Sequence, residues 1–201
     1  MSVDRVQVSV KRSVLAAGGL GLLSLWAFAV RGASEPPAFT ASTEPSAVVL
    51  YVGMTAPTTG TTRSMTVYGA GRVELRKQRL TRVEESFDLS IEPPERDRLL
   101  RLAVEHDLAE WDDVSIRARL ARSLGTKTIV MSDAPTTRVI LALTRYERDG
   151  RELEDIKKEI SFQAVHTAAE VAPDVPELMG LGLLVEEMNA LWTNARGEDQ
   201  P

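Results

Sequence analysis

Hydrophobic and polar positions divide the chain into five parts. Residues 13–30 are apolar and contain no charged residue, whereas apolar positions in residues 47–195 recur with the periods of strands and helices. Between them, a stretch rich in Pro, Ser, Thr and Ala lacks any such period, which is typical of a disordered linker. We therefore expect a cytoplasmic n-region (1–12), a signal or transmembrane helix (13–30), a disordered linker (31–46), an α+β domain (47–195) and a polar tail (196–201).

Strand patterns occur early in the domain and again after its middle. Alternating apolar and polar residues predict a strand with one solvated face, and a short run that is apolar throughout predicts a buried strand. We expect hairpin turns at Gly69-Ala70-Gly71 and at Asp149-Gly150. Residues 152–159 could alternatively form a short helical turn. The expected strands are residues 47–52, 64–68, 72–77, 86–91, 126–131, 137–146 and 156–165.

Two segments have the apolar period of an amphipathic helix. Residues 95–111 follow Pro94 and repeat apolar side chains every three or four positions. Near the end of the chain, Asp174 and Glu177 have capping-box spacing ahead of a second stripe. Residues 112–124 have helical spacing but remain ambiguous. The second stripe is Leu178, Leu181, Val185, Met188 and Trp192. We predict an α+β fold with an antiparallel sheet of about six strands and two main packed helices, preceded by one N-terminal hydrophobic helix.

The apolar run 13–30 determines the compartment that we expect for the domain. As a helix it would reach about 27 Å, just short of the ~30 Å hydrocarbon core of a bilayer. Lys11-Arg12 precedes it, as the positive-inside rule prefers for an anchor. Residues 11–19 also resemble a twin-arginine export signal in which a lysine replaces the first arginine. Ala27-Phe28-Ala29 fits the rule for cleavage after Ala29. We expect either a membrane anchor with a periplasmic domain or an exported periplasmic protein.

Charge and cysteine content exclude several classes of function. The chain has a formal net charge of −5. Residues 1–31 hold four basic residues and one acidic residue, so the remainder nets −8. An acidic domain lacks the basic stripe that nucleic acids require, so we expect no nucleic-acid partner. The absence of cysteine excludes disulfides, thiol catalysis and a lipid-modified cysteine anchor.

One acidic cluster could attract a metal ion. His106 and Glu110 are four residues apart and would share a helix face, and Asp112 and Asp113 follow closely. The H-E-x-x-H pattern of zinc hydrolases is absent, and the second histidine, His166, lies sixty residues away. We expect the four side chains to form a solvated helix end, with no metal and no cofactor. A G-x-S-x-G nucleophile motif is also absent.

A basic run follows the first hairpin turn. Basic side chains at this density could bind an anionic envelope polymer or lipid head groups. Glu74 interrupts the run and Glu84-Glu85 follows it, so a solvated strand face is the commoner interpretation. The run consists of Arg72, Arg76, Lys77, Arg79 and Arg82.

The hairpin sequence from Ser64 to Leu75, SMTVYGAGRVEL, resembles a class of small exported bacterial domains of unknown function. These open with an apolar strand, a loop and a Tyr-Gly-x-Gly-x-Val hairpin, and the resemblance covers residues 47–193. Members often carry a cysteine pair in the first loop, whereas residues 55–62 contain none. The resemblance implies no activity and identifies no functional residue.

These observations favour a non-enzymatic envelope module that binds a protein or a polymer, held at the membrane through residues 13–30. One alternative is an envelope hydrolase whose carboxylates assemble only in three dimensions, which predicts a cleft with converging acids. Another is a domain like a protease inhibitor, with Met54 to Thr62 as its exposed loop.

Overall fold

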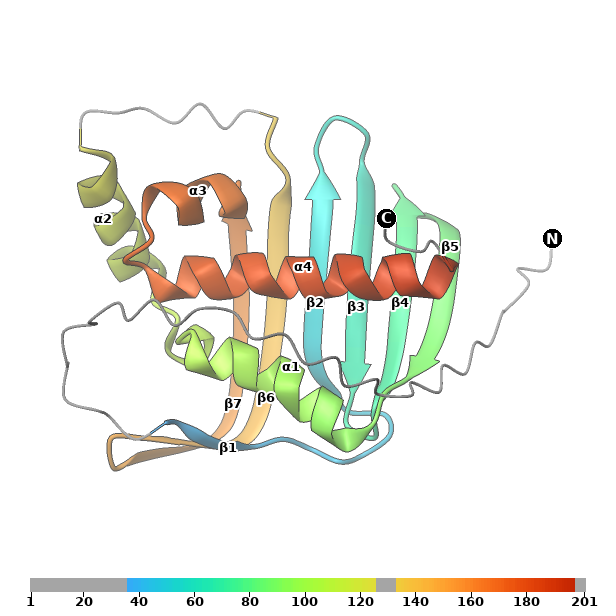
Figure 1. The fold of residues 1–201 in the computed structure, drawn as a ribbon, viewed down its shortest axis with the longest axis horizontal. Coiled ribbons are helices and arrows are strands. Elements are labelled where there is room, and N and C mark those ends of the chain that lie inside the picture. Colours follow the sequence, from blue (N-terminus) through green and yellow to red (C-terminus); the bar gives the residue numbers. More distant parts are fainter. Residues whose placement is uncertain (1–35, 126–132, 198–201) are drawn as a thin grey trace, which may run out of the picture.

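The computed structural model describes residues 36–125 and 133–197, which form an α+β fold (Figure 1). Within these residues one antiparallel sheet holds seven strands, so the predicted α+β class and antiparallel sheet are confirmed, with four helices where two main ones were expected. The elements are β1 (Ala38–Thr40), β2 (Val48–Ala56), β3 (Thr61–Tyr68), β4 (Arg72–Arg79), β5 (Arg82–Ser90), α1 (Pro93–Glu105), the 3-10 turn η1 (Leu108–Glu110), α2 (Asp113–Leu124), β6 (Thr136–Arg148), β7 (Arg151–Gln163), α3 (Val165–Val171) and α4 (Pro176–Arg196).

The sheet is organised around β6. From β5 the order runs through β4, β3 and β2 to β6, and β7 pairs with β6 along its whole length. β2 pairs with residues 136–141 of β6, and β1 pairs with residues 145–147 of β6. Both strands therefore lie on the side of β6 that faces away from β7. The short strand β1 therefore extends this side of β6 beyond the start of β2.

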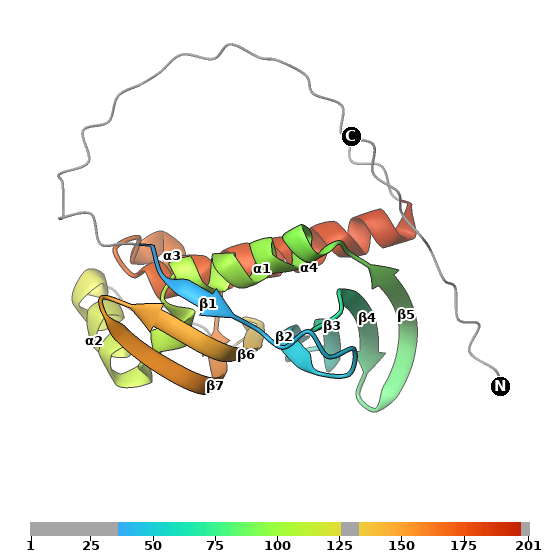
Figure 2. The same cartoon turned by 90° about the horizontal axis from the view of Figure 1, so that it is seen from below.

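Helices α1 and α4 cover one face of the sheet (Figure 2). Alternate residues of each strand point toward them because side chains on a strand alternate between its faces. The predicted stripe of α4 is confirmed, since all five of its side chains are buried against the core. On the strands, the core includes Leu50, Val52, Met65, Val67, Val73, Leu75, Val139 and Leu141.

The predicted helix over residues 95–111 is interrupted. α1 ends at Glu105, and Asp107 adopts a left-handed conformation with a φ of 61°. The chain then turns through η1, which buries Leu108 and Ala109. A continuous helix would direct these apolar residues differently, so tertiary burial outweighs the helical period.

Four further elements either differ from their sequence-based expectations or were left open by the sequence. The capping box of α4 does not form, because Val175 is the N-cap and Glu177 instead pairs with Arg119. Residues 152–159 belong to β7 rather than to a helical turn, and α3 was not expected. The ambiguous segment 112–124 is helical from Asp113 onward.

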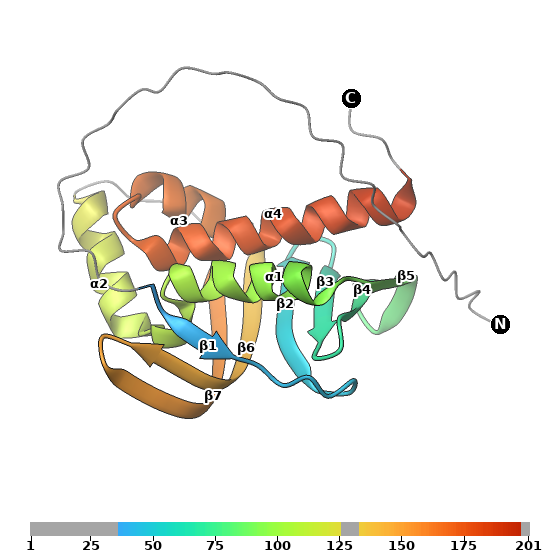
Figure 3. The ribbon, with the colours of Figure 1, turned by 60° about the horizontal axis from the view of Figure 1, so that its bottom comes forward.

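The middle of the expected linker also differs from prediction. Ala38–Thr40 forms β1, and Figure 3 shows it lying between α1 and the β6–β7 hairpin. Phe39 packs against the core, and the hydroxyls of Thr40 and Thr144 are 2.8 Å apart. The apolar run 13–30, the expected strand 126–131 and the end of the polar tail lie outside the described residues. None of the helices in residues 36–125 and 133–197 is long and apolar enough to cross a membrane.

The glycines of the Tyr-Gly-x-Gly hairpin have structural roles. A Cβ at Gly69 would lie 2.5 Å from the carbonyl oxygen of Ser42, and one at Gly71 would lie 2.3 Å from that of Ile91. Gly71 also has a φ of 87°, which favours glycine. The predicted hairpin is confirmed, and its glycines allow close contact with the segment before β2 and with the end of β5.

Candidate functional site

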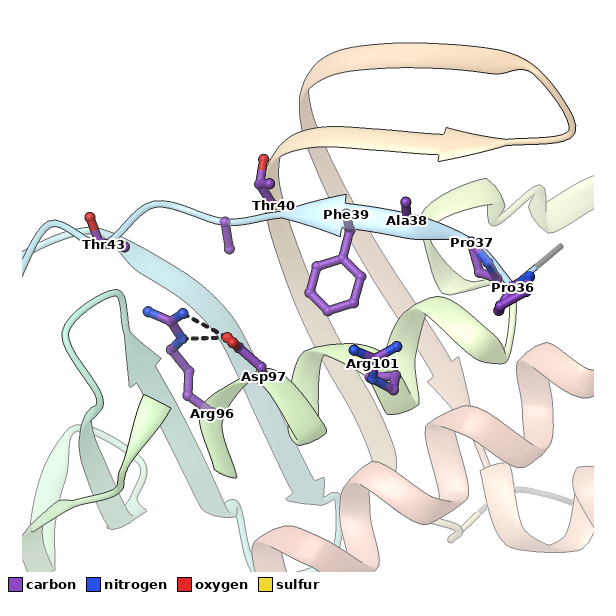
Figure 4. A pocket seen from close by; sticks show the side chains of 10 residues that line it. Pro36, Pro37, Ala38, Phe39, Thr40, Thr43, Arg96, Asp97 and Arg101 are labelled. Carbon is purple, nitrogen blue, oxygen red and sulfur yellow. Dashed lines mark hydrogen bonds and ion pairs between the residues drawn. The ribbon is translucent and has the colours of Figure 1, made fainter. Parts of the chain in front are cut away.

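A groove of about 540 Å³ lies between β1 and α1 (Figure 4). This volume falls in the range of ligand pockets, which is about 300–1,000 Å³. Apolar residues come mainly from β1 and its flanks, whereas the charged residues come from α1. The lining consists of Pro36, Pro37, Ala38, Phe39, Thr40, Ala41, Thr43, Arg96, Asp97 and Arg101.

Strand alternation directs Phe39 into the groove. The Phe39 ring points from β1 toward α1, while Ala38 and Thr40 point to the other side of the strand (Figure 4). This direction follows from the pairing of β1 with β6, because adjacent residues of a strand face opposite ways. Phe39 therefore provides the aromatic surface of the groove.

Arg96 and Asp97 neutralise each other at one end of the groove. The Arg96 guanidinium donates hydrogen bonds from Nε, at 2.8 Å, and from Nη2, at 2.6 Å, to Oδ1 of Asp97. It also donates to the carbonyl oxygen of Gly69, which ties α1 to the β3–β4 turn. The Arg96 side chain is only 11% exposed, so this pair is a fixed part of the groove wall.

Arg101 leaves the groove with a net positive charge. Its guanidinium carbon lies 5.7 Å from the centre of the Phe39 ring, within the range of a cation–π contact. Arg101 is exposed and makes no ion pair with any residue that the structure describes. The groove thus offers an uncompensated guanidinium beside an aromatic ring.

The lining of the groove lacks the groups that drive common hydrolytic chemistry. No histidine lies among its residues, and its one carboxylate, Asp97, is held by Arg96. The hydroxyl of Thr40 is already hydrogen-bonded to that of Thr144. A nucleophile with an adjacent general base is therefore not assembled there.

The four acidic-cluster residues identified in the sequence have separate environments. His106 is the C-cap of α1, and its Cβ would be 2.4 Å from a Cβ added at Gly180 of α4. Asp112 caps α2 by accepting from the backbone N–H groups of Val114 and Ser115, and Asp113 pairs with Arg117 at 2.7 Å. In the described part of the chain, no group of three or more potential ligands could hold a metal ion.

Glu110, the remaining member, belongs to a network that joins η1 to β6. The Tyr146 hydroxyl donates to Oε1 of Glu110 at 2.7 Å, and Arg148 pairs with Asp107. Tyr146 is only 1% exposed. Its burial, together with the hydrogen bond to Glu110, raises the pKa of Tyr146 to about 12. This network fixes the turn after α1.

The two histidines do not come together. His106 lies over Gly180, and His166 lies beside Gly182. If Gly182 carried a Cβ, this atom would lie 3.6 Å from Nδ1 of His166. Residues two apart on a helix do not share a face. Each histidine therefore packs beside a different side of α4.

One pair of neighbouring carboxylates lies on the sheet face opposite α1 and α4. Glu74 and Asp88 are direct partners on β4 and β5. Arg76 donates to Glu74 from Nε at 2.8 Å, and Tyr68 donates to it at 3.2 Å. Arg72 lies 3.6 Å from Asp88. Arginines thus flank both acids, an arrangement typical of an ion-pair network.

The basic run is divided by these contacts. Arg72 and Arg76 contact acids on the sheet face, and Lys77 pairs with Glu84 and Glu85 at 3.2 and 2.9 Å. The hydrogen bond to Glu85 is the main cause that raises the pKa of Lys77. Arg79 and Arg82, at the end of the hairpin, make no ion pair with a described residue.

The segment from Met54 to Thr62 is not an extended loop. Its two ends belong to β2 and β3, and only the turn over residues 57–60 joins them. The hydroxyls of Thr55 and Thr62 lie 2.9 Å apart across the hairpin. The segment belongs mostly to strands of the sheet, so it does not support the alternative in which residues 54–62 form the exposed loop of a protease inhibitor.

Sequence reasoning missed the groove residues. Phe39 is the only aromatic residue in a stretch rich in Pro, Ser and Thr, and that isolation is a usable signal. Asp97 and Arg101 are four apart on α1, so a shared helix face could be predicted. The proximity of Phe39 to Arg101 could not be, because it depends on the pairing of β1 with β6.

No family model matches the chain, and neither a curated protein nor a solved structure is significantly similar to it.

Proposed function

We propose that this protein is a non-enzymatic binding module of the cell envelope and that the groove between β1 and α1 holds its ligand. The ligand group combines an anion with an apolar body, as an apolar C-terminal residue of a protein or peptide does. The anion pairs with Arg101, and the apolar body packs on Phe39 and its apolar neighbours.

The observation that carries this proposal is the uncompensated guanidinium of Arg101 beside the Phe39 ring. A cation without a partner in a groove attracts an anionic group, and a charged hydrogen bond contributes about 1.5–3 kcal/mol. The Arg96–Asp97 pair gives the groove a rigid wall without adding net charge. Rigid walls favour binding because less conformational entropy is lost.

Residues 13–30 carry the second part of the proposal. We infer that this apolar run keeps the domain on the periplasmic side of a membrane as an uncleaved anchor, or that it is removed after Ala29. Intact mass of the protein from membrane and soluble fractions distinguishes the two forms. A cytoplasmic, soluble, full-length protein would contradict both.

The groove can be tested with N-acetyl-L-phenylalaninate and its neutral amide as a matched pair of probes. The full chain in a nonionic detergent should bind the carboxylate in the millimolar range, given about 0.3 kcal/mol per non-hydrogen atom. The amide, which lacks the negative charge, should bind about tenfold more weakly. Mass spectrometry should recover the probe unchanged, as expected for binding without turnover.

Substitutions within the groove test the same contacts. Arg101→Gln should weaken carboxylate binding about tenfold and abolish the preference over the amide. Phe39→Ala should weaken both probes. Arg122→Gln, an exposed arginine of α2 outside the groove lining, is the matched control and should bind both probes like the wild type. Equal binding of both probes to wild type and Arg101→Gln would refute the proposed site.

The hydrolase alternative is less well supported. One candidate for its pair of carboxylates is Glu74 and Asp88, which Arg76 and Arg72 flank. Neither acid lines the groove. Turnover of an envelope substrate that is lost in Glu74→Gln and retained in Arg101→Gln would favour that alternative over binding.

A further inference from the structure

The end of the β4–β5 hairpin exposes an apolar side chain between two arginines. Arg79 and Arg82 are direct partners across the strands, so Leu80 and Thr81 alone form the turn. Leu80 is 76% exposed, and Val83 beside the turn is also exposed. Residues 79–83 form the hairpin tip.

Three features of the hairpin tip are unfavourable for folding. Leu80 has a φ of 54°, a left-handed conformation that strains a residue with a Cβ. Like charges directly opposite each other on paired strands repel, as Arg79 and Arg82 do. A large apolar side chain is left in water. Local rules are commonly broken in this way at functional sites.

The hairpin tip is held in place rather than loose. The backbone N–H of Leu80 donates to the carbonyl oxygen of Gly60 at 3.0 Å, which joins this turn to the β2–β3 turn at the same end of the sheet (Figure 1). A Cβ at Gly60 would lie 3.0 Å from Cδ2 of Leu80. The adjoining turn therefore supports Leu80 in its exposed position.

The charge around the hairpin tip is positive although the chain as a whole is acidic. Residues 76–82 include four basic residues and no acidic one. Arg76 and Lys77 contact acids on the sheet, but Arg79 and Arg82 make no ion pair among the described residues. Two uncompensated cations thus flank one protruding leucine.

We propose that the hairpin tip docks on an anionic lipid bilayer, with Leu80 among the head groups and Arg79 and Arg82 on lipid phosphates. Basic residues beside an anionic membrane are attracted to it, and an apolar side chain gains by leaving water. A stable protein interface buries about 800 Å² on each partner, far more than one protruding turn presents. The proposal is independent of the ligand in the groove.

The absence of cysteine allows a probe to be placed at one position in the full chain. Leu80→Cys carries an environment-sensitive nitrobenzoxadiazole dye, and Val114→Cys carries the same dye as the matched control. Val114 on α2 is 77% exposed, so both dyes start in water. Vesicles of phosphatidylcholine alone are compared with vesicles of equal parts phosphatidylcholine and phosphatidylglycerol.

On anionic vesicles, the dye at position 80 should shift to the blue and be quenched by nitroxide lipids, and the dye at position 114 should not. The apolar run 13–30 could attach the chain to either kind of vesicle, so attachment alone is not the measurement. Arg79→Gln and Arg82→Gln should each lower the docking constant about fivefold. Circular dichroism checks that these variants remain folded.

Four results would overturn the proposal. They are no change at position 80, an equal change at positions 80 and 114, the same change on neutral vesicles, and a change caused by soluble polyphosphate but not by vesicles. The last result would point to a soluble polyanion as the partner. Groove binding is measured on different residues, so failure here would not affect the proposed function.

Discussion

Replacing Tyr146 by phenylalanine should produce a loss of stability that disappears at high pH. The hydroxyl of the buried Tyr146 donates to Glu110 at 2.7 Å. A hydrogen bond to a charged group contributes about 1.5–3 kcal/mol, and Glu110 can be hydrated after the change, so the loss at pH 7 should be about 1.5 kcal/mol. Urea unfolding of the detergent-solubilised full chain, followed by tryptophan fluorescence, measures it.

The pH dependence follows from the pKa of Tyr146, which burial raises from 10.0 to about 12. The folded state keeps the phenol neutral while the unfolded chain ionises, so the associated stability is complete below pH 10 and is lost as the pH rises toward 12. Between pH 7 and pH 11 the unfolding free energy of the wild type should fall by about 1.4 kcal/mol more than that of Tyr146→Phe. The two proteins should then be nearly equal in stability.

Tyr51→Phe is the matched control for the loss of a hydroxyl. Among the described residues the Tyr51 hydroxyl makes no hydrogen bond, so this change should alter the unfolding free energy at pH 7 by less than about 0.5 kcal/mol. Other ionising groups are common to wild type and Tyr146→Phe and cancel in their difference. A difference at pH 11 as large as at pH 7 would refute the assignment of a buried, neutral Tyr146 bonded to Glu110.

Three further predictions concern stability and use the same unfolding assay. Gly71→Ala should lower the unfolding free energy by at least about 2 kcal/mol, because Gly71 has a φ of 87° and an added Cβ would lie 2.3 Å from a backbone oxygen. Gly150→Ala should lower it by only about 1 kcal/mol, because Gly150 has a φ of 75° but an added Cβ would be in open space. Equal losses would contradict the proposed close contact at Gly71. Hydrogen bonds from Lys77, and secondarily from Arg196, lower the pKa of Glu85. The ionised Glu85 therefore stabilises the fold above pH 4.5, and this stabilisation is lost as the pH falls through the pKa of Glu85 in the folded state. Glu85→Gln should therefore be destabilised by up to about 1 kcal/mol at pH 7 and by less at pH 3, and a constant difference would count against this. Leu80→Gly should relieve the left-handed strain and raise the unfolding free energy by about 0.5–1 kcal/mol, and a decrease would show that Leu80 contributes to folding.

The elements that the sequence predicted are those with a long apolar period. The stripe of α4 and the alternation in β6 bury side chains over many turns or pairs, so their patterns are readable. The hairpin at Gly69-Ala70-Gly71 was also predictable, because its turn residues carry local backbone preferences.

The remaining elements depend on contacts between distant residues. β1 has only three residues in a stretch rich in Pro, Ser and Thr, and pairing with β6 alone makes it a strand. The break after α1 depends on the burial of Leu108 and Ala109, which outweighs helical periodicity. The groove could not be predicted for the same reason, since Phe39 and Arg101 meet only once β1 is in the sheet.

The most direct test of the proposed groove is a nuclear magnetic resonance titration of the full chain with N-acetyl-L-phenylalaninate. Backbone amide resonances of residues 36–43 and 96–101 should move with one saturation curve, and the neutral amide should need about ten times the concentration to move them equally. The expected dissociation constant, from the size of the probe, is in the millimolar range. Shifts confined to another surface would contradict the proposed binding module, and so would the absence of shifts at a probe concentration of about ten times that constant.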